Sequence, residues 1–236
     1  MSNTKSDCHK SSTSSSCQFC DMKDESLICS HPGAIDIIDK AKVTARFKAG
    51  QTIFYAGNDP IGIFTIQKGL VKLEVTSPSG SAHTLRLMGP GAALGYRSMF
   101  ANEPYHASAV AVEDCELCFI SKADMMNIFS KYPEIALKLL EHISKDLRVA
   151  EEKWMGQMDK GAAERIADAL LFLQDHFAHQ NWTRREIAQW AGTTPETVIR
   201  TLSQFEKEGL VDQTDGRNIR ILSKEKLKIR ASTPGV

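Results

Sequence analysis

Near its C-terminal end the chain reads Trp182-Thr-Arg-Arg-Glu-Ile-Ala-Gln-Trp-Ala-Gly-Thr-Thr-Pro-Glu-Thr-Val-Ile-Arg-Thr-Leu202. Thr183 has the side chain of a helix N-cap, and Gly192 allows the sharp turn that ends a first short helix. One of the two threonines after Gly192 caps a second helix, and Pro195 falls in its first turn, where a missing backbone N–H costs little. The stretch therefore predicts a helix-turn-helix.

The second predicted helix has two chemically different faces. Val198, Leu202 and Phe205 recur at steps of four and three residues and form a buried face. The opposite face carries Glu196 and Arg200, which lie one turn apart. Arginine donates two hydrogen bonds to guanine, and glutamate accepts one from the cytosine amino group. A solvated ion pair between the two is the alternative, but their place on the second helix favours the reading of DNA bases.

Other residues of this stretch suit further contacts with double-stranded DNA. We assign base contacts to Ser203 and to Pro195, the latter through shape or apolar contact only. From residue 183 to the end, ten Lys and Arg outnumber seven Asp and Glu, although the whole chain of 236 residues has a net charge of zero. A hairpin that turns at Asp215-Gly216 is expected to complete a winged helix-turn-helix. Residues suited to phosphate contacts lie around the starts of the two helices: Arg184, Arg185, Thr193 and Thr194.

Between about Val43 and Ile120 the sequence pattern changes to short apolar runs separated by glycines. Runs of this kind predict an antiparallel β-sandwich or barrel. A short amphipathic helix is expected over 34–42, and the Ser-rich residues 1–16 have the composition of a disordered tail. Strands followed by helices make the chain an α+β protein.

One long helix is predicted from Pro133 to about Met158, with a length of about 38 Å. A long helix with a narrow apolar seam typically packs against a copy of itself. The alternative is that it packs on the chain's own sheet. We favour a homodimer because a helix-turn-helix binds DNA as a two-fold dimer. The seam recurs at steps of four, four, three and four residues: Leu139, Ile143, Leu147, Ala150 and Trp154.

Residues 183–210 resemble the recognition module of the CRP/FNR superfamily of bacterial transcription regulators. Glu196 and Arg200 match the family's Glu and Arg, which read a G·C pair within a TGA-containing half-site. The resemblance extends over roughly 34–225 and includes the opening strands of a β-roll of the cyclic-nucleotide-binding type. The family's dimerisation helix matches the long helix. RNA polymerase is a further partner that the resemblance implies.

The resemblance divides the chain into four parts. They are a Ser-rich tail with a Cys-containing sensory segment (1–33), a β-roll effector domain (34–132), a dimerisation helix (133–159) and a winged helix-turn-helix DNA-binding domain (160–236).

The chain has six cysteines and no secretory signal, so we expect it in the reducing cytoplasm. Cysteines there are more often metal ligands or redox sensors than structural disulfides. Cys17, Cys20 and Cys29 lie in the N-terminal segment, and Cys118 lies at the end of the β-roll. By resemblance to the FNR branch, these four hold a [4Fe-4S] cluster, for which four thiolates are the standard ligand set.

The spacing of the cysteines departs from the FNR pattern at one point. Eight residues separate Cys20 from Cys29, where five are typical, but a longer loop can still close because closure entropy rises slowly with length. Structural zinc and reversible thiol oxidation remain alternatives for the four thiols. Cys8 is a spare ligand that can replace one of them, and Cys115 is expected in the core.

Family members that bind cyclic AMP hold its phosphate with a Gly-Glu and a later Arg-Ser or Arg-Thr. Here Tyr96 stands in place of the Glu, and Tyr105-His106 in place of the Arg-Ser. Cyclic AMP is therefore not the expected ligand. Arg97 and His106 can instead line a pocket for another anion, which leaves a different small ligand in the β-roll as an alternative effector.

Together these features predict a DNA-binding transcription regulator that senses oxygen, nitric oxide or redox state. By resemblance, an intact cluster orders the Cys17–Cys29 segment against the long helix and favours the DNA-binding dimer. The operator is expected to be palindromic, with half-sites roughly 34 Å apart. The sequence has no nucleophile–base set or phosphate loop, which argues against an enzyme, and no apolar run long enough to span a membrane.

Overall fold

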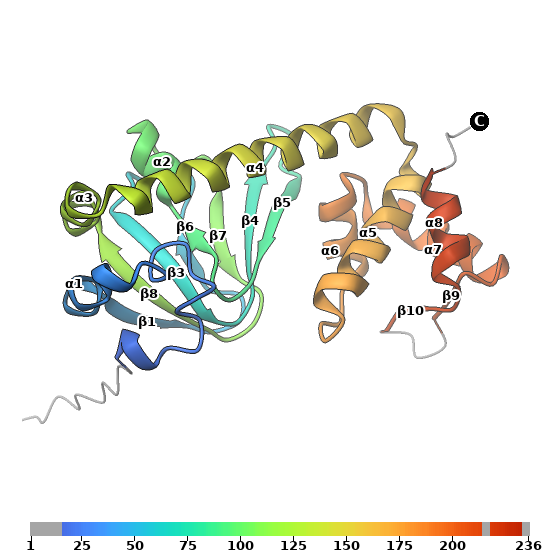
Figure 1. The fold of residues 1–236 in the computed structure, drawn as a ribbon. Helices are drawn as coiled ribbons and strands as arrows, with labels where there is room; N and C mark the ends of the chain where they lie inside the picture. Colours follow the sequence, from blue (N-terminus) through green and yellow to red (C-terminus); the bar gives the residue numbers. More distant parts are fainter. Residues whose placement is uncertain (1–15, 214–217, 233–236) are drawn as a thin grey trace, which may run out of the picture.

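The computed structural model describes residues 16–213 and 218–232 (Figure 1). Cys8, most of the Ser-rich tail and the Asp215-Gly216 turn lie outside the described residues. A β-rich unit lies at one end of the molecule and a helical unit at the other, and one long helix runs along the first toward the second. The α+β class and the β-roll with a C-terminal helix-turn-helix, both expected from the sequence, are confirmed.

The β-roll consists of two four-stranded antiparallel sheets, in the strand orders β1-β8-β3-β6 and β2-β7-β4-β5. At Gly69, between β3 and β4, φ is +96°, and an added Cβ would lie 2.7 Å from the Asp114 carbonyl oxygen, so only glycine fits this corner. The strands are β1 (Val43–Phe47), β2 (Thr52–Phe54), β3 (Gly62–Lys68), β4 (Val71–Thr76), β5 (Ala82–Met88), β6 (Ala93–Leu94), β7 (Ser108–Ala111) and β8 (Cys115–Ser121).

Helices cover one end of the roll and form the C-terminal unit. Before, within and directly after the roll lie the 3₁₀ turns η1 (Cys17–Phe19) and η2 (Pro32–Ala34) and the helices α1 (Ile35–Ala41), α2 (Tyr96–Ala101) and α3 (Lys122–Lys131). The C-terminal unit contains α5 (Ala162–Phe177), α6 (Arg184–Ala191), α7 (Pro195–Lys207), the short strands β9 (Val211–Asp212) and β10 (Arg220–Ile221), and α8 (Lys224–Ser232). The antiparallel β9–β10 pair lies where the wing was predicted.

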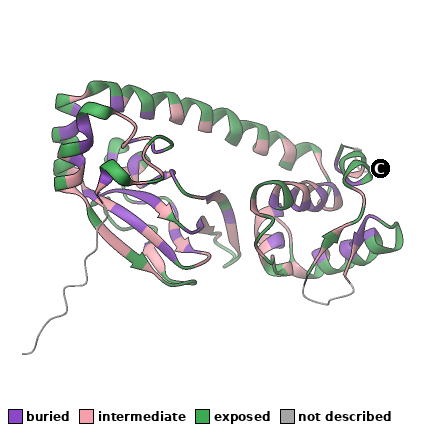
Figure 2. Ribbon diagram, turned by 60° about the horizontal axis from the view of Figure 1, so that its bottom comes forward, coloured by how far each residue is buried: buried purple, intermediate pink, exposed green. Residues whose placement is uncertain are grey.

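The long helix α4 (Pro133–Asp159) has two halves with different surroundings. Its first half packs on the chain's own β-roll, where Leu139 is fully buried and Ile143 lies partly buried against the same core. Its second half is mostly exposed, as Figure 2 shows, with Leu147 60% and Trp154 64% exposed. The assignment of Leu139 to the dimer seam was therefore wrong, because the protomer's own core already covers this side chain.

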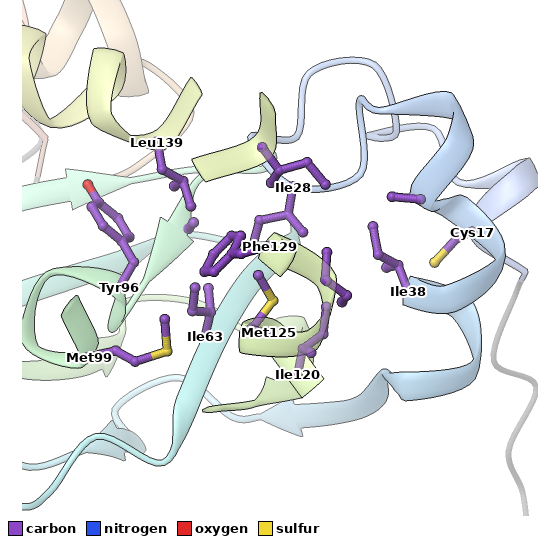
Figure 3. Packing of buried hydrophobic residues seen from close by; sticks show 14 of the residues in the cluster. Cys17, Ile28, Ile38, Ile63, Tyr96, Met99, Ile120, Met125, Phe129 and Leu139 are labelled. Carbon is purple, nitrogen blue, oxygen red and sulfur yellow. The ribbon is translucent and has the colours of Figure 1, made fainter. Parts of the chain in front are cut away.

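Three groups of buried apolar residues form the interior. One lies inside the β-roll, and a second joins α5, α6, α7 and α8. The third joins α1, α3 and the start of α4, and includes Cys17 and Ile28 of the N-terminal segment (Figure 3). The N-terminal segment is thus part of the core at the end of the roll. Over the described ranges, no helix has the length and apolar character needed to cross a bilayer.

Candidate DNA-reading helix and four-thiol site

Local capping interactions fix the geometry of the helix-turn-helix. Thr183 and Glu186 form a capping box at the start of α6, in which each side chain bonds to the other residue's backbone N–H. Gly192 ends α6 with a φ of +63°. The Thr194 hydroxyl accepts from the Thr197 backbone N–H at 3.3 Å and caps α7, whose first residue is Pro195. These caps confirm the helix signals predicted from the sequence.

The two faces of α7 differ as the sequence pattern predicts. Val198, Leu202 and Phe205 are fully buried in the core of the C-terminal unit. Glu196 and Arg200 are exposed on the opposite face, and no ion pair joins them in the part of the chain that the structure describes. Hydrogen bonds from its own backbone N–H and from Thr194 lower the pKa of Glu196 and keep it a carboxylate, which can only accept.

The other residues assigned to DNA contact lie around these two helices. Ser203 is exposed on α7 and donates to the Ile199 carbonyl oxygen at 3.1 Å, and Pro195 is half-buried at the start of α7. Among the phosphate candidates, Arg185 is exposed, whereas Arg184 is half-buried and donates to Gln213 Oε1 at 3.0 Å. Thr193 is half-buried and Thr194 is exposed.

The four cysteines assigned to a cluster come together at the end of the β-roll. Cys17 and Cys29 share a hydrogen bond, and Cys20 and Cys118 lie within electrostatic range of them. Cys118 faces this site because side chains alternate along β8: Ile120 shares its face, whereas Cys115 and Leu117 point into the roll. Cys115 bonds to the carbonyl oxygens of Leu70 and Glu113 and is the core residue that was expected.

The thiols of this site are free and differ in acidity. The Cys17–Cys29 hydrogen bond lowers the pKa of Cys29 and raises that of Cys17, and burial raises the pKa of Cys118 to about 11. Their raised pKa values keep Cys17 and Cys118 protonated at neutral pH, although the Lys42 ammonium group lies close to both. Among the described residues, no three His, Cys, Asp or Glu side chains lie in an arrangement that could hold one metal ion.

The N-terminal segment also contacts the start of α4. Lys138 Nζ donates to Ser30 Oγ at 2.5 Å, and the rings of His31 and Tyr132 lie 5.0 Å apart between centroids. Ile28 and Leu139 belong to the same buried cluster (Figure 3). The N-terminal segment therefore touches the part of α4 that packs on the roll.

A cavity of about 920 Å³ lies between the β-roll, α2, α4 and α6. Arg97 and His106 both line it, as the sequence predicts. The cavity also contains Arg86, a site residue that the sequence analysis missed. Its guanidinium forms a bidentate ion pair with Asp146 of α4, which also accepts from the Tyr96 hydroxyl at 2.9 Å. A lone arginine on an amphipathic strand carries no sequence signal of such a partner.

Lys153 joins α4, β5 and α6, and the sequence analysis missed this residue too. Its ammonium group lies 3.8 Å from the centroid of the Trp190 ring and donates to the carbonyl oxygens of Thr84 and Leu85 at 3.3 and 3.4 Å. Burial, together with the nearby charge of Arg86, lowers the pKa of Lys153 to about 8. This contact links the β-roll to the DNA-binding unit within one chain.

Comparison with known proteins matches both units of this fold. Residues 44–132 match the family model of the cyclic nucleotide-binding domain, and 164–230 match that of the Crp-like helix-turn-helix domain. The chain is 34% identical over 167 residues to the "Cyclic AMP receptor protein" of Thermus thermophilus, covering 70% of this chain and 77% of that protein. It is 25% identical over 198 residues to the "Transcriptional activator protein FnrA" of Stutzerimonas stutzeri, covering 80% of each.

Solved structures give the same assignment. A transcriptional regulator of the CRP/FNR family from Thermus thermophilus superposes with a TM-score of 0.70 at 28% identity, over 82% of this chain and 100% of its own. The similar proteins are transcription regulators and not enzymes. With its β-roll, its helix-turn-helix and these relatives, the chain belongs to the CRP/FNR family of transcription regulators.

Proposed function

We propose that this regulator belongs to the FNR-like branch and senses oxygen, nitric oxide or redox state through a [4Fe-4S] cluster bound by Cys17, Cys20, Cys29 and Cys118. The observation that carries the proposal is the meeting of four free thiols from two distant segments of the chain. When bound, such a cluster supplies an iron–sulfide core that oxygen and nitric oxide destroy. The relative named FnrA is consistent with this branch.

The preference for a cluster over a single zinc ion rests on the resemblance of these cysteines to those of the FNR branch. Zinc needs four sulfur atoms at about 2.3 Å from one centre. Cys17 and Cys29 share a hydrogen bond, and Cys20 and Cys118 lie within electrostatic range of them. A cluster takes its four thiolates at different iron atoms, so it accepts a wider spacing.

We propose that the site controls DNA binding through α4. The cysteine segment contacts the first half of this helix through Ser30 and Ile28. The exposed second half, with Leu147, Ala150 and Trp154, is the surface we assign to a homodimer, and Ile143 lies at its edge. Binding of the cluster orders the segment against α4 and favours the dimer that binds DNA.

On DNA, we assign base reading to Glu196 and Arg200 in a palindromic operator with a TGA-containing half-site. Pro195 and Ser203 contact neighbouring bases, and the phosphate contacts fall to Arg184, Arg185, Thr193 and Thr194. The exposure of both Glu196 and Arg200 supports this assignment. By family resemblance, the protein acts in the cytoplasm and contacts RNA polymerase. We retain the four parts 1–33, 34–132, 133–159 and 160–236 as its domain boundaries.

A second candidate function is regulation by a small ligand in the 920 Å³ cavity, which Arg97 and His106 line. The relative named "Cyclic AMP receptor protein" raises cyclic AMP as that ligand. Cyclic AMP remains an unexpected ligand. The guanidinium group of Arg86 lines the cavity, but its ion pair with Asp146 already neutralises it. Zinc binding or thiol oxidation at the four cysteines would likewise regulate the protein without a cluster.

The proposal is tested by iron and acid-labile sulfide analysis of protein purified without oxygen. We expect brown protein with about four iron and four sulfide per chain. Cys118→Ala should lose both, whereas Cys115→Ala, a matched change on the same strand that faces the core, should retain them. Colourless wild-type protein without iron contradicts the cluster. Zinc in its place, lost in Cys118→Ala, supports the zinc alternative.

A further inference from the structure

An ion pair between a buried lysine and a partly exposed aspartate lies beside the four-thiol site. Asp39 is on the last turn of α1, and Lys42 lies between α1 and β1. Lys42 Nζ is 2.9 Å from Asp39 Oδ1, and the Lys42 side chain is only 2% exposed. Lysine is almost never buried this completely unless a partner compensates its charge. Neither residue belongs to the thiol set or to the DNA-reading surface.

Asp39 also binds the start of the cysteine segment. Its Oδ1 accepts from the Cys17 backbone N–H at 2.9 Å, and its Oδ2 accepts from the Ser16 hydroxyl at 3.1 Å. Ser16 in turn caps η1 by accepting from the Gln18 backbone N–H. One carboxylate thus ties the backbone at Cys17 to α1, which fixes where the first thiol lies.

Lys42 faces the thiols themselves. Its ammonium group is within hydrogen-bonding reach of the Cys17 thiol and within electrostatic range of Cys118. These two cysteines come from the two segments that the site joins. The ion pair is therefore oriented, with its carboxylate on the Cys17 backbone and its cation toward the sulfur atoms.

We infer that Asp39 and Lys42 are positioning residues of the four-thiol site, in which Asp39 fixes the Cys17 backbone and Lys42 places a buried positive charge close to Cys17 and Cys118. The role of Lys42 rests on the proposed function, because four thiolates with an iron–sulfide core form an anionic group. Burying such a group is costly unless an opposite charge lies close by. Outer-shell partners of this kind tune affinity and redox potential at metal sites.

The test compares Lys42→Met, Lys42→Arg and Asp39→Asn with changes to an exposed ion pair of the same β-roll. Lys48 Nζ and Asp114 Oδ2 lie 2.6 Å apart at the surface, so Lys48→Met and Asp114→Asn are the matched controls. Iron release to a chelator is followed in full-length protein without oxygen. We expect Lys42→Met to accelerate release roughly 10- to 100-fold, Lys42→Arg to restore slow release, and both control variants to behave as wild type. Unchanged release in Lys42→Met, or no rescue by arginine, overturns the charge role.

Hydrogen exchange of the iron-free protein tests the positioning role separately. We expect Asp39→Asn to speed exchange of the peptide that contains the Cys17 amide, while Asp114→Asn leaves it unchanged. Equal exchange in Asp39→Asn and wild type overturns the positioning role, whatever the iron measurements give. If the wild type binds no iron, the proposed function and the charge role both fail, and the exchange result still decides the role of Asp39.

Discussion

The DNA-reading helix and the four-thiol site are built in different ways. The helix-turn-helix comes from one continuous stretch, 183–205, held by two caps, one glycine and its own buried face. The thiol site joins turns over 17–29 to Cys118 in the middle of a sheet. A module with local determinants keeps its shape when the rest of the molecule changes. A site assembled across the chain depends on contacts between distant segments, which suits the sensor role that we propose for it.

The largest expected effect comes from disrupting the buried core next to the four-thiol site. Leu139→Ala removes a fully buried side chain from the cluster that contains Cys17 and Ile28, and should cost about 2–5 kcal/mol of unfolding free energy. Leu147→Ala, on the exposed half of α4, should cost the monomer less than about 0.5 kcal/mol. Chemical denaturation measures both. Hydrogen exchange should rise over 16–31 in Leu139→Ala and stay unchanged over 195–207, and equal acceleration in both stretches would contradict the comparison.

The next effect concerns base reading by the helix-turn-helix. Arg200→Ala and Glu196→Ala should each weaken operator binding by about 1–3 kcal/mol and relax specificity at one base pair. Arg185→Ala, a matched change at an exposed phosphate candidate, should weaken binding to all sequences equally and reduce the salt dependence by about one charge. Titrations against a set of singly substituted operators measure the difference. A uniform loss for Arg200→Ala would exclude base reading.

A smaller effect tests whether the helix-turn-helix forms independently of the four-thiol site. Thr194→Ala removes the N-cap of α7 and should cost about 1 kcal/mol of unfolding free energy. Thermal unfolding and iron analysis of the same preparation measure the two regions together. The iron content should equal that of wild type, because the cap lies outside the thiol site. Loss of iron in this variant would show that the two regions do not form independently.

The smallest effect concerns Lys153, which links the β-roll to the DNA-binding unit. Its folded-state pKa of about 8 lies below the value of about 10.4 for a free lysine, so between these values the unfolded chain binds more protons. Stability should therefore rise with pH, by about 1 kcal/mol from pH 7 to pH 9 in wild type relative to Lys153→Met. Urea unfolding at both pH values measures this difference. The same pH dependence in both proteins would show that Lys153 is not buried in solution.

The contrast between the regions also explains what could be predicted from sequence. The caps at Thr183 and Thr194 and the turn at Gly192 depend on neighbours within a few residues, so their signals are visible in the chain. The short helix α8 was not predicted, since only Leu227 and Ala231 of its residues are buried.

Interactions between distant residues could not be predicted in this way. Arg86 bonds to Asp146, sixty residues away, and Lys153 reaches Trp190 and two strand carbonyl groups. In the sequence alone, Arg86 and Lys153 each look like an ordinary charged surface residue. Leu139 was assigned to a dimer seam because a helical period shows which residues share a face, but not what covers that face. The cysteines were grouped only because the family resemblance supplied a partner for the N-terminal three.

The central claim is that the four-thiol site controls DNA binding, and one measurement tests it most directly. The affinity of anaerobically prepared protein for a palindromic duplex with TGA-containing half-sites is measured by fluorescence anisotropy before and after exposure to air. We expect tight binding that is lost together with the brown colour, and weak binding by Cys118→Ala under both conditions. Equal wild-type affinity before and after the colour is lost, or wild-type affinity in Cys118→Ala, would contradict the account.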